Sequence, residues 1–472
     1  MRVSMDRRLA FVGVLAAAVL VSGCGGAPAE IPESASLAPS DAVVFARIAT
    51  DGDSSQWQKA ERVLERIPGV RDGLVSAIEQ ELSDEGLDWE TDVAPALGDE
   101  VVIVATAKLR PIVLLEPESE EKLDALLAKS DEETVRGEVE GRIAVAEKDA
   151  DLAEYRAALA RGTIEDDEAF LAGLDALPAE SLGLVWVDVG VLTDDLSSLF
   201  EEATQERLEL GIDWLSASLS AEEDGMLVAM GMRTPGGGDT HYEPELFRRV
   251  PADAVAAISF GGTQGTLDRL QGQIDLGELS KTIEDATGVS LDGIIDALSG
   301  EGVLYVRSGA EKLPDVTLAL APPNRDEAWS TVDRLARKLA TEMQTTVTTT
   351  VENGVEVSML VVEDVTIRYA RLDADTVVVT SDEDALATLA GDGPKLVDAD
   401  DFVRARADVG LEDRTKGFVY VDVDGMLPLI EGLAGESIPA EVRDDVEAVD
   451  SLVFQTSGDG DTTRVSGFVR VP

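Results

Sequence analysis

The sequence predicts an α+β fold made of two tandem related repeats, each a largely antiparallel sheet with flanking helices. Three observations predict it. Apolar positions at helical spacing alternate with short runs rich in valine and isoleucine. Several of those runs are joined by turns short enough for hairpins. Two short sequence motifs also occur twice in the same order: residues 38–43 match 250–255, and residues 183–189 match 417–423.

The chain begins with a predicted lipoprotein signal peptide. Three arginines precede residues 9–21, an uncharged run of 13 residues that has the length of a signal h-region. A helix of that length is too short to cross a hydrocarbon core of about 30 Å. Val21-Ser22-Gly23-Cys24 follows and resembles the bacterial lipobox, which is cut before a cysteine that carries a diacylglyceryl group. We therefore expect residues 1–23 to be the signal peptide.

Cys24 is the only cysteine in the chain and the predicted site of lipid attachment. Two acyl chains on one residue give durable membrane attachment, whereas one gives only marginal binding. An ordinary cleaved signal and an uncleaved anchor are the alternatives. Once Cys24 is acylated no thiol remains for a disulfide or a cysteine metal site. Residues 24–36 are rich in Gly, Ala, Pro and Ser, and we expect a flexible tether that holds the protein at the extracytoplasmic face of the cell membrane.

The first repeat is predicted to span residues 37–234. Pro39-Ser40-Asp41 opens its first strand, and a helix that contains Trp57 ends at Pro68-Gly69. A second helix has Val70, Leu74, Ile78 and Leu82 on one face. The remaining expected elements are strands at 101–106 and 112–115, a short helix at 123–127, a strand at 183–189, and a hairpin of 214–220 with 226–232.

Residues 235–249 form the predicted linker, because Pro235-Gly236-Gly237-Gly238 is a glycine-rich segment between the two sets of repeated motifs. The second repeat is predicted to span 250–472. Its long helix starts at Asn324, with Glu327 three residues later in a capping-box arrangement. The spacing between matched sequence motifs of the two repeats grows from 212 to 234 residues, which indicates an insertion in the second repeat at about Thr346–Tyr369. Asn353-Gly354 predicts a hairpin there, and 451–456 with 463–471 predict a second one.

Several sequence motifs of the chain resemble those of one protein family. They are the opening Leu37-Ala38-Pro39-Ser40-Asp41-Ala42, the segment from Gly86 to Glu100, and the strand Val185-Trp186-Val187-Asp188-Val189. They are similar to a family of bacterial exported proteins known only as a domain of unknown function. The resemblance covers most of 37–472 and implies a fold, but its motifs are packing and turn residues and imply no chemistry. The second copy departs from it, because Asp296 stands where the first copy has Pro95.

The composition excludes some classes of partner. The formal charge is −55, and it becomes −57 once residues 1–23 are removed. Phosphate backbones and anionic lipid would both be repelled, so we expect no nucleic-acid partner. An apolar content of 44% is too high for a disordered acidic chain, so a packed core is expected. The acidity fits either an ordinary solvated surface or adaptation to salt.

The sequence offers weak candidates for chemistry. His241 is the only histidine and lies in the linker, where it is interpreted as an exposed residue rather than as part of a catalytic arrangement, which needs an orienting partner. Asp188 and Asp422 end matched strands and are interpreted as helix caps rather than as paired catalytic carboxylates. Gly458–Asp461 and Asp398–Asp401 lack the pattern of an EF-hand loop. We therefore predict no catalytic, cofactor-binding or metal-binding residues.

Function is predicted at the level of class. The chain is expected to be a lipid-anchored, extracytoplasmic, acidic protein that works in the envelope through binding or assembly, with the membrane as its partner through Cys24 and envelope proteins or a small molecule as further partners. One alternative is a lipoprotein that carries a small ligand, which requires an apolar pocket of a few hundred Å³. Another is a hydrolase with two carboxyls about 5–9 Å apart.

Overall fold

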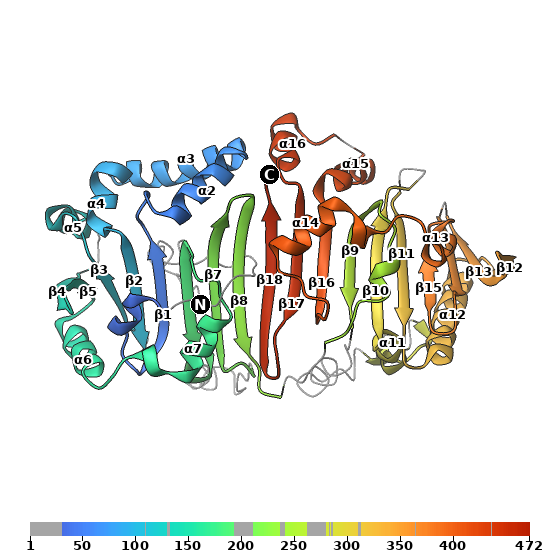
Figure 1. Ribbon diagram of the computed structural model, residues 1–472, viewed down its shortest axis with the longest axis horizontal. Helices are drawn as coiled ribbons and strands as arrows, with labels where there is room; N and C mark the ends of the chain where they lie inside the picture. Colours follow the sequence, from blue (N-terminus) through green and yellow to red (C-terminus); the bar gives the residue numbers. More distant parts are fainter. Residues whose placement is uncertain are drawn as a thin grey trace. The chain divides into compact units, whose positions relative to one another are not determined.

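The fold was analysed in a computed structural model (Figure 1). It describes residues 31–108, 110–129, 133–192, 211–236, 241–261, 280–282, 284, 287–309, 313–363, 365–435 and 437–472. The chain divides into two compact units. Unit 1 comprises Met1–Gly236, Asp444–Ala448 and Asp461–Pro472, and unit 2 comprises Gly237–Arg443 and Val449–Gly460. Both are mixed α and β with antiparallel sheets, so the predicted α+β class is confirmed.

The sheet of unit 1 has the strand order β4-β5-β3-β2-β1-β6-β7-β8-β18, and every neighbouring pair is antiparallel. The predicted hairpin of β7 with β8 is confirmed over the full length of both strands. The strands are β1 (Ala42–Ala49), β2 (Glu100–Thr106), β3 (Pro111–Leu115), β4 (Val135–Val139), β5 (Arg142–Ala146), β6 (Gly183–Asp188), β7 (Trp214–Glu222), β8 (Gly225–Arg233) and β18 (Thr462–Arg470).

Helices cover both faces of this sheet. On one face Phe170 of α7 packs edge-to-face against Phe45 and Trp186, with ring centroids 5.4 and 5.5 Å apart. On the other face Leu123 of α5 packs with Val101 and other strand residues. The helical elements are η1 (Glu33–Leu37), α2 (Ser55–Glu65), α3 (Pro68–Asp84), η2 (Trp89–Val93), α4 (Ala94–Leu97), α5 (Glu120–Leu127), α6 (Asp149–Leu159), η3 (Ile164–Asp166) and α7 (Glu168–Asp175).

The last strand of the chain differs from its predicted assignment. The sequence placed all of 250–472 in the second repeat, whereas β18 pairs with β8 from Thr462 to Arg470 and belongs to unit 1 (Figure 1). Phe468 is buried there, and Arg470 pairs with Asp224 at 2.9 Å. Matching repeated sequence motifs locates a strand along the chain, but it does not show which sheet edge the strand pairs with.

The sheet of unit 2 has the strand order β12-β13-β14-β15-β11-β10-β9-β16-β17, again antiparallel throughout. The predicted insertion contributes the β12–β13 hairpin, whose turn residues Asn353 and Gly354 have φ of 50° and 83°. The strands are β9 (Ala254–Phe260), β10 (Glu301–Arg307), β11 (Asp315–Ala321), β12 (Thr348–Glu352), β13 (Val355–Val362), β14 (Val365–Arg371), β15 (Val377–Thr380), β16 (Gly417–Asp422) and β17 (Ser451–Ser457).

Unit 2 has an aromatic core cluster. Phe402 of α14 lies against Phe247 and against Tyr420 of β16, with centroids 4.9 and 5.3 Å apart. The predicted N-cap is confirmed, because Asn324 Oδ1 accepts from Glu327 N at 3.3 Å. The return contact of the predicted capping box differs: the side-chain Nδ2 of Asn324, rather than its backbone amide, donates to the Glu327 carboxylate at 2.9 Å. The helical elements are η4 (Phe247–Arg249), α11 (Leu291–Leu298), α12 (Arg325–Glu342), α13 (Ala385–Ala390), η5 (Leu396–Asp398), α14 (Asp400–Asp408), α15 (Val423–Ala434) and α16 (Ala440–Glu447), which spans the division between the units.

The matched motifs at 38–43 and 250–255, which open the two predicted repeats, make the same backbone contacts in their own units. The amide of Ile164 donates to Ala38 O at 3.0 Å, and the amide of Leu396 donates to Val250 O at 2.9 Å. One residue after each of these carbonyls, Pro39 and Pro251 form isolated antiparallel bridges. The local geometry therefore agrees with the match between these two sequence motifs, while the duplication of the whole unit stays a prediction.

Candidate functional site

The residues singled out from the sequence fall in different places. Cys24, its lipobox and the linker residues 237–240 lie outside the described residues. His241 is half-buried and precedes Tyr242 in unit 2. Asp398 lies in η5, and Asp400 and Asp401 lie in the first turn of α14. Among the described residues, no group of three or more His, Cys, Asp or Glu side chains is placed to hold a metal ion.

The two strand-terminal aspartates act as caps in their own units, as interpreted. Asp188 Oδ1 accepts from Val191 N at 2.9 Å, and Asp422 Oδ1 accepts from Gly425 N at 3.0 Å at the start of α15. Burial raises the pKa of Asp422, and the capping bond opposes that shift. Each carboxylate therefore satisfies free helix amides rather than facing a substrate.

A less expected group is the half-buried Glu301, the first residue of β10. Its carboxylate accepts a hydrogen bond from Leu246 N in the segment that leads into unit 2. Burial raises the pKa of Glu301 to about 7, and the backbone hydrogen bonds from Leu246 and Phe247 only partly oppose that effect. The side chain therefore changes its charge near neutral pH.

Tyr242 and Ser259 lie beside Glu301, and we call these three residues the Glu301 cluster. The Tyr242 hydroxyl lies 2.8 Å from Ser259 Oγ on β9, and burial raises the pKa of that hydroxyl. The Tyr242 backbone exchanges two hydrogen bonds with Thr415, at 2.9 and 3.1 Å. Its ring lies over Gly261, where an added Cβ would be 2.4 Å from Tyr242 Cγ. The cluster thus fastens residues 242–247 to the sheet of unit 2.

The matched residue in unit 1 is Glu100, the first residue of β2, and its surroundings differ. Its carboxylate pairs with Arg47, and with Arg142 at 2.9 Å. The strand registers place Ser259 in unit 2 where unit 1 has Arg47. They place Thr376 where unit 1 has Arg142. Glu301 therefore lacks both of the cations that neutralise Glu100.

Arg249 does not replace them. It has the smallest of the effects on the pKa of Glu301, a lowering, and its guanidinium is bound to Asp373 at 2.7 Å. Glu245 is a further carboxylate nearby and raises the pKa of Glu301. Chemically, the Glu301 cluster can take up and release one proton near neutrality at the point where the chain enters unit 2. The only sequence signal was the matched position of Glu100 and Glu301, which says nothing about charge.

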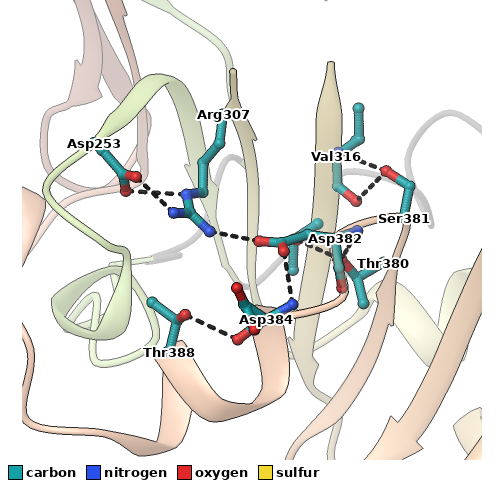
Figure 2. Close-up of polar contacts among 9 residues, drawn as sticks. Asp253, Arg307, Val316, Thr380, Ser381, Asp382, Asp384 and Thr388 are labelled. Carbon is teal, nitrogen blue, oxygen red and sulfur yellow. Dashed lines mark hydrogen bonds and ion pairs between the residues drawn. The ribbon is translucent and has the colours of Figure 1, made fainter. Parts of the chain in front are cut away.

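A second polar cluster surrounds Arg307 at the end of β10 (Figure 2). Its guanidinium lies between two carboxylates. It donates to both oxygens of Asp253, at 2.9 and 2.5 Å, and to Asp382 Oδ2 at 2.6 Å. The Asp382 side chain is 5% exposed, and its other oxygen accepts from Asp384 N at 2.8 Å.

These contacts explain what the Arg307 cluster can do. The paired carboxylates raise the pKa of Arg307, so its charge persists at any working pH. Burial and the nearby Asp382 raise the pKa of Asp315, the cross-strand neighbour of Arg307. Because Asp253 and Asp382 share one cation, they tie together the loops around the strand ends.

The hollow beside the aromatic core of unit 2 is small. It has a cavity volume of about 30 Å³ and is lined by residues that include Phe247, Arg406 and Asp413. That volume accommodates about one water molecule. It does not supply the pocket of a few hundred Å³ that the ligand-carrier alternative requires. Within the described ranges, no helix is long and apolar enough to cross a membrane.

Comparison with known proteins yields distant structural likeness. No family model matches the chain. No curated protein matches it either. Crystal form I of a protein named TP0453 is 10% identical, with a TM-score of 0.26, over 48% of this chain and 93% of that one. Crystal form IV of TP0453 is 12% identical, with a TM-score of 0.25, over 48% and 92%. Likeness at this level supports no argument about function.

Proposed function

We propose that this protein is a lipid-anchored, extracytoplasmic acidic protein that acts in the cell envelope through binding or assembly. The observation that carries the proposal is the N-terminal pattern of a basic region, 13 uncharged residues, and Val21-Ser22-Gly23-Cys24 with the only cysteine of the chain. Two acyl chains on Cys24 would hold the protein durably at the membrane.

Two features of the described residues support binding rather than catalysis. The carboxylates of the Arg307 cluster are neutralised by an arginine, and Asp382 also accepts from the backbone amide of Asp384, which suits a structural role. In addition, the helix α3 and the strand β12 expose apolar side chains, including Leu74 at 49% and Val351 at 69%. On α3 the exposed residues Val70, Leu74, Val75 and Ile78 follow one another closely, and a contiguous exposed apolar patch is typical of a surface that contacts a partner.

Intact-mass spectrometry of the protein extracted from membranes tests the anchor. We expect the mass of a chain that starts at Cys24 and carries diacylglyceryl on its sulfur. The Cys24→Ser variant, which keeps the rest of the signal, should lose the lipid mass and leave the membrane fraction. A mature N-terminus beyond Cys24, or an unmodified Cys24 on a membrane-bound chain, would contradict the proposal.

A further inference from the structure

The outer edge of β12 is an open strand edge in unit 2. Within the described part of the chain β12 pairs with β13 alone, from Thr348 opposite Met359 to Glu352 opposite Val355, without any irregularity (Figure 1). Glu352 and Val355 flank the two-residue turn Asn353-Gly354, so they form a hydrogen-bonded pair.

The alternation of an antiparallel ladder then fixes the direction of every other backbone group in β12. Thr350 and Thr348 direct their amides and carbonyls towards β13, as Glu352 does. Thr349 and Val351 direct theirs outward. These outward groups can form the ladder of one more antiparallel strand.

The residues of β12 favour such an addition. Nine consecutive residues from Met343 to Val351 carry no charge, in a chain in which 28% of residues are charged. β12 itself is Thr-Thr-Thr-Val-Glu, and threonine and valine are among the best strand formers. Val351 is 69% exposed. The strand has no proline, lysine or bulge, which are the usual devices that block pairing at an edge.

The edge of the unit 1 sheet shows what a closed edge looks like in the same chain. β4 has the sequence Val-Arg-Gly-Glu-Val. Its two-residue turn makes Glu138 a residue with outward backbone groups, and Arg156 of α6 donates to Glu138 O at 3.0 and 3.2 Å. Arg136 is paired with Asp124 at 2.8 Å. The edge of β4 is thus covered by arginine, whereas the edge of β12 is not.

The charge around β12 selects the kind of strand that can add. From Thr341 to Asp364 the chain has five carboxylates and no basic residue, and the whole chain carries −55. A second copy would bring the same charge, and five residues per side fall far short of the roughly 20–30 per side of a stable interface. An extended segment with basic flanks is instead attracted over a distance.

We infer that β12 is a docking edge to which a partner protein adds an extended, lysine- or arginine-flanked segment as an antiparallel strand, paired with Thr349 and Val351. The inference names the surface through which the proposed binding function operates. The contact does not need the lipid anchor. A failed anchor test and a failed edge test are therefore separate outcomes.

The probe is a labelled synthetic peptide of alternating threonine and valine with two lysines at each end, titrated against the purified full chain. We expect saturable binding that weakens as sodium chloride rises. Hydrogen exchange should slow at the amides of Thr349 and Val351, because these amides would become hydrogen-bonded. The same peptide with glutamates in place of lysines should bind at least about tenfold more weakly. Absence of binding, or protection elsewhere in the chain, overturns the inference.

Two proline variants provide a matched test. Thr349→Pro removes an outward amide of β12 and leaves the ladder to β13 intact, so peptide affinity should fall by about tenfold or more. Glu138→Pro makes the same change on the outer edge of β4 and should leave affinity unchanged. Equal affinity of Thr349→Pro and the unchanged protein, with melting temperatures preserved, overturns the inference.

Two further measurements cover the remaining outcomes. If Thr349→Pro does not fold, Val351→Lys keeps the backbone and should lower affinity by repelling the flanking lysines; unchanged affinity there overturns the inference as well. Sedimentation of the full chain tests the other occupant. A dimer that Thr349→Pro dissociates would show that a second copy pairs with β12, which contradicts a partner strand.

Discussion

Glu100 and Glu301 begin matched strands but have opposite electrostatic surroundings. Arg47 and Arg142 hold Glu100, whereas serine and threonine stand at those positions around Glu301. The pKa of Glu301 is about 7 in the folded protein, above its ordinary value of 4.5. The folded state therefore binds more protons than the unfolded state between these values, and stability falls as pH rises from about 4.5 to about 7.

We predict that Glu301→Gln raises the free energy of unfolding at pH 8 by about 1 kcal/mol, a figure reduced for the partial exposure of the side chain. Glutamine keeps an acceptor for Leu246 N and removes the charge from this half-buried position. Urea unfolding at pH 5 and pH 8 measures the effect, which should be small at pH 5. Glu100→Gln is the control and should destabilise at pH 8, because it leaves Arg47 and Arg142 without their carboxylate. Identical pH profiles for Glu301→Gln and the unchanged protein would refute the assignment.

Residue roles were predictable from sequence where they depend on neighbours along the chain. The caps at Asp188, Asp422 and Asn324 each need only the next few residues. The charge state of Glu301 depends on which residues face it from β9 and the start of β15. No local pattern contains that register, so the Glu301 cluster could not be found from the sequence.

Among the elements, α3 shows the difference between predicting a helix and predicting its partner. The spacing of Val70, Leu74, Ile78 and Leu82 predicted a helix, and α3 spans Pro68–Asp84. These four residues share one face of the helix, yet Val70, Leu74 and Ile78 are 50%, 49% and 44% exposed and only Leu82 is buried. Periodicity fixes which side chains share a face but not what covers them.

We predict that Leu74→Lys changes the free energy of unfolding by no more than about 0.5 kcal/mol, because the side chain is already in water. Leu82→Lys should cost several times more, on the order of 3 kcal/mol, because it places a cation in a buried site. Chemical denaturation of both variants measures the contrast. A large loss from Leu74→Lys would mean that its face packs against something in the folded protein.

Hairpins show the same limit on prediction at the level of elements. Asn353-Gly354 is a strong turn signal and predicted the β12–β13 hairpin. The β4–β5 hairpin was missed, because its turn is Glu140-Gly141 and two of the five residues of its outer strand β4 are charged. Glu140 adopts a φ of 48°, which is uncommon for glutamate and gives no warning in the sequence.

For the whole molecule, net charge is the dominant sequence property. Charges of one sign repel within a compact chain, and the Debye length falls from about 10 Å at 0.1 M salt to about 3 Å at 1 M. We predict that the melting temperature of the full chain rises between these concentrations of sodium chloride. Chloride is the better anion, because sulfate also strengthens apolar burial. A flat or falling melting temperature would show that repulsion among carboxylates does not limit stability.

The pairing of β18 with β8 also determines when the sheet of unit 1 can be completed during synthesis. A ribosome completes β8, which ends at Arg233, roughly 230 residues before it reaches β18 at Thr462. At about 5–20 residues per second, this delay is on the order of ten to fifty seconds. Throughout it, the edge of β8 lacks the nine-residue strand that finally pairs with it. A nascent chain that terminates before Thr462 keeps this edge open to proteases and to other unfinished chains, so the sheet of unit 1 is completed only when residues 462–470 have been made.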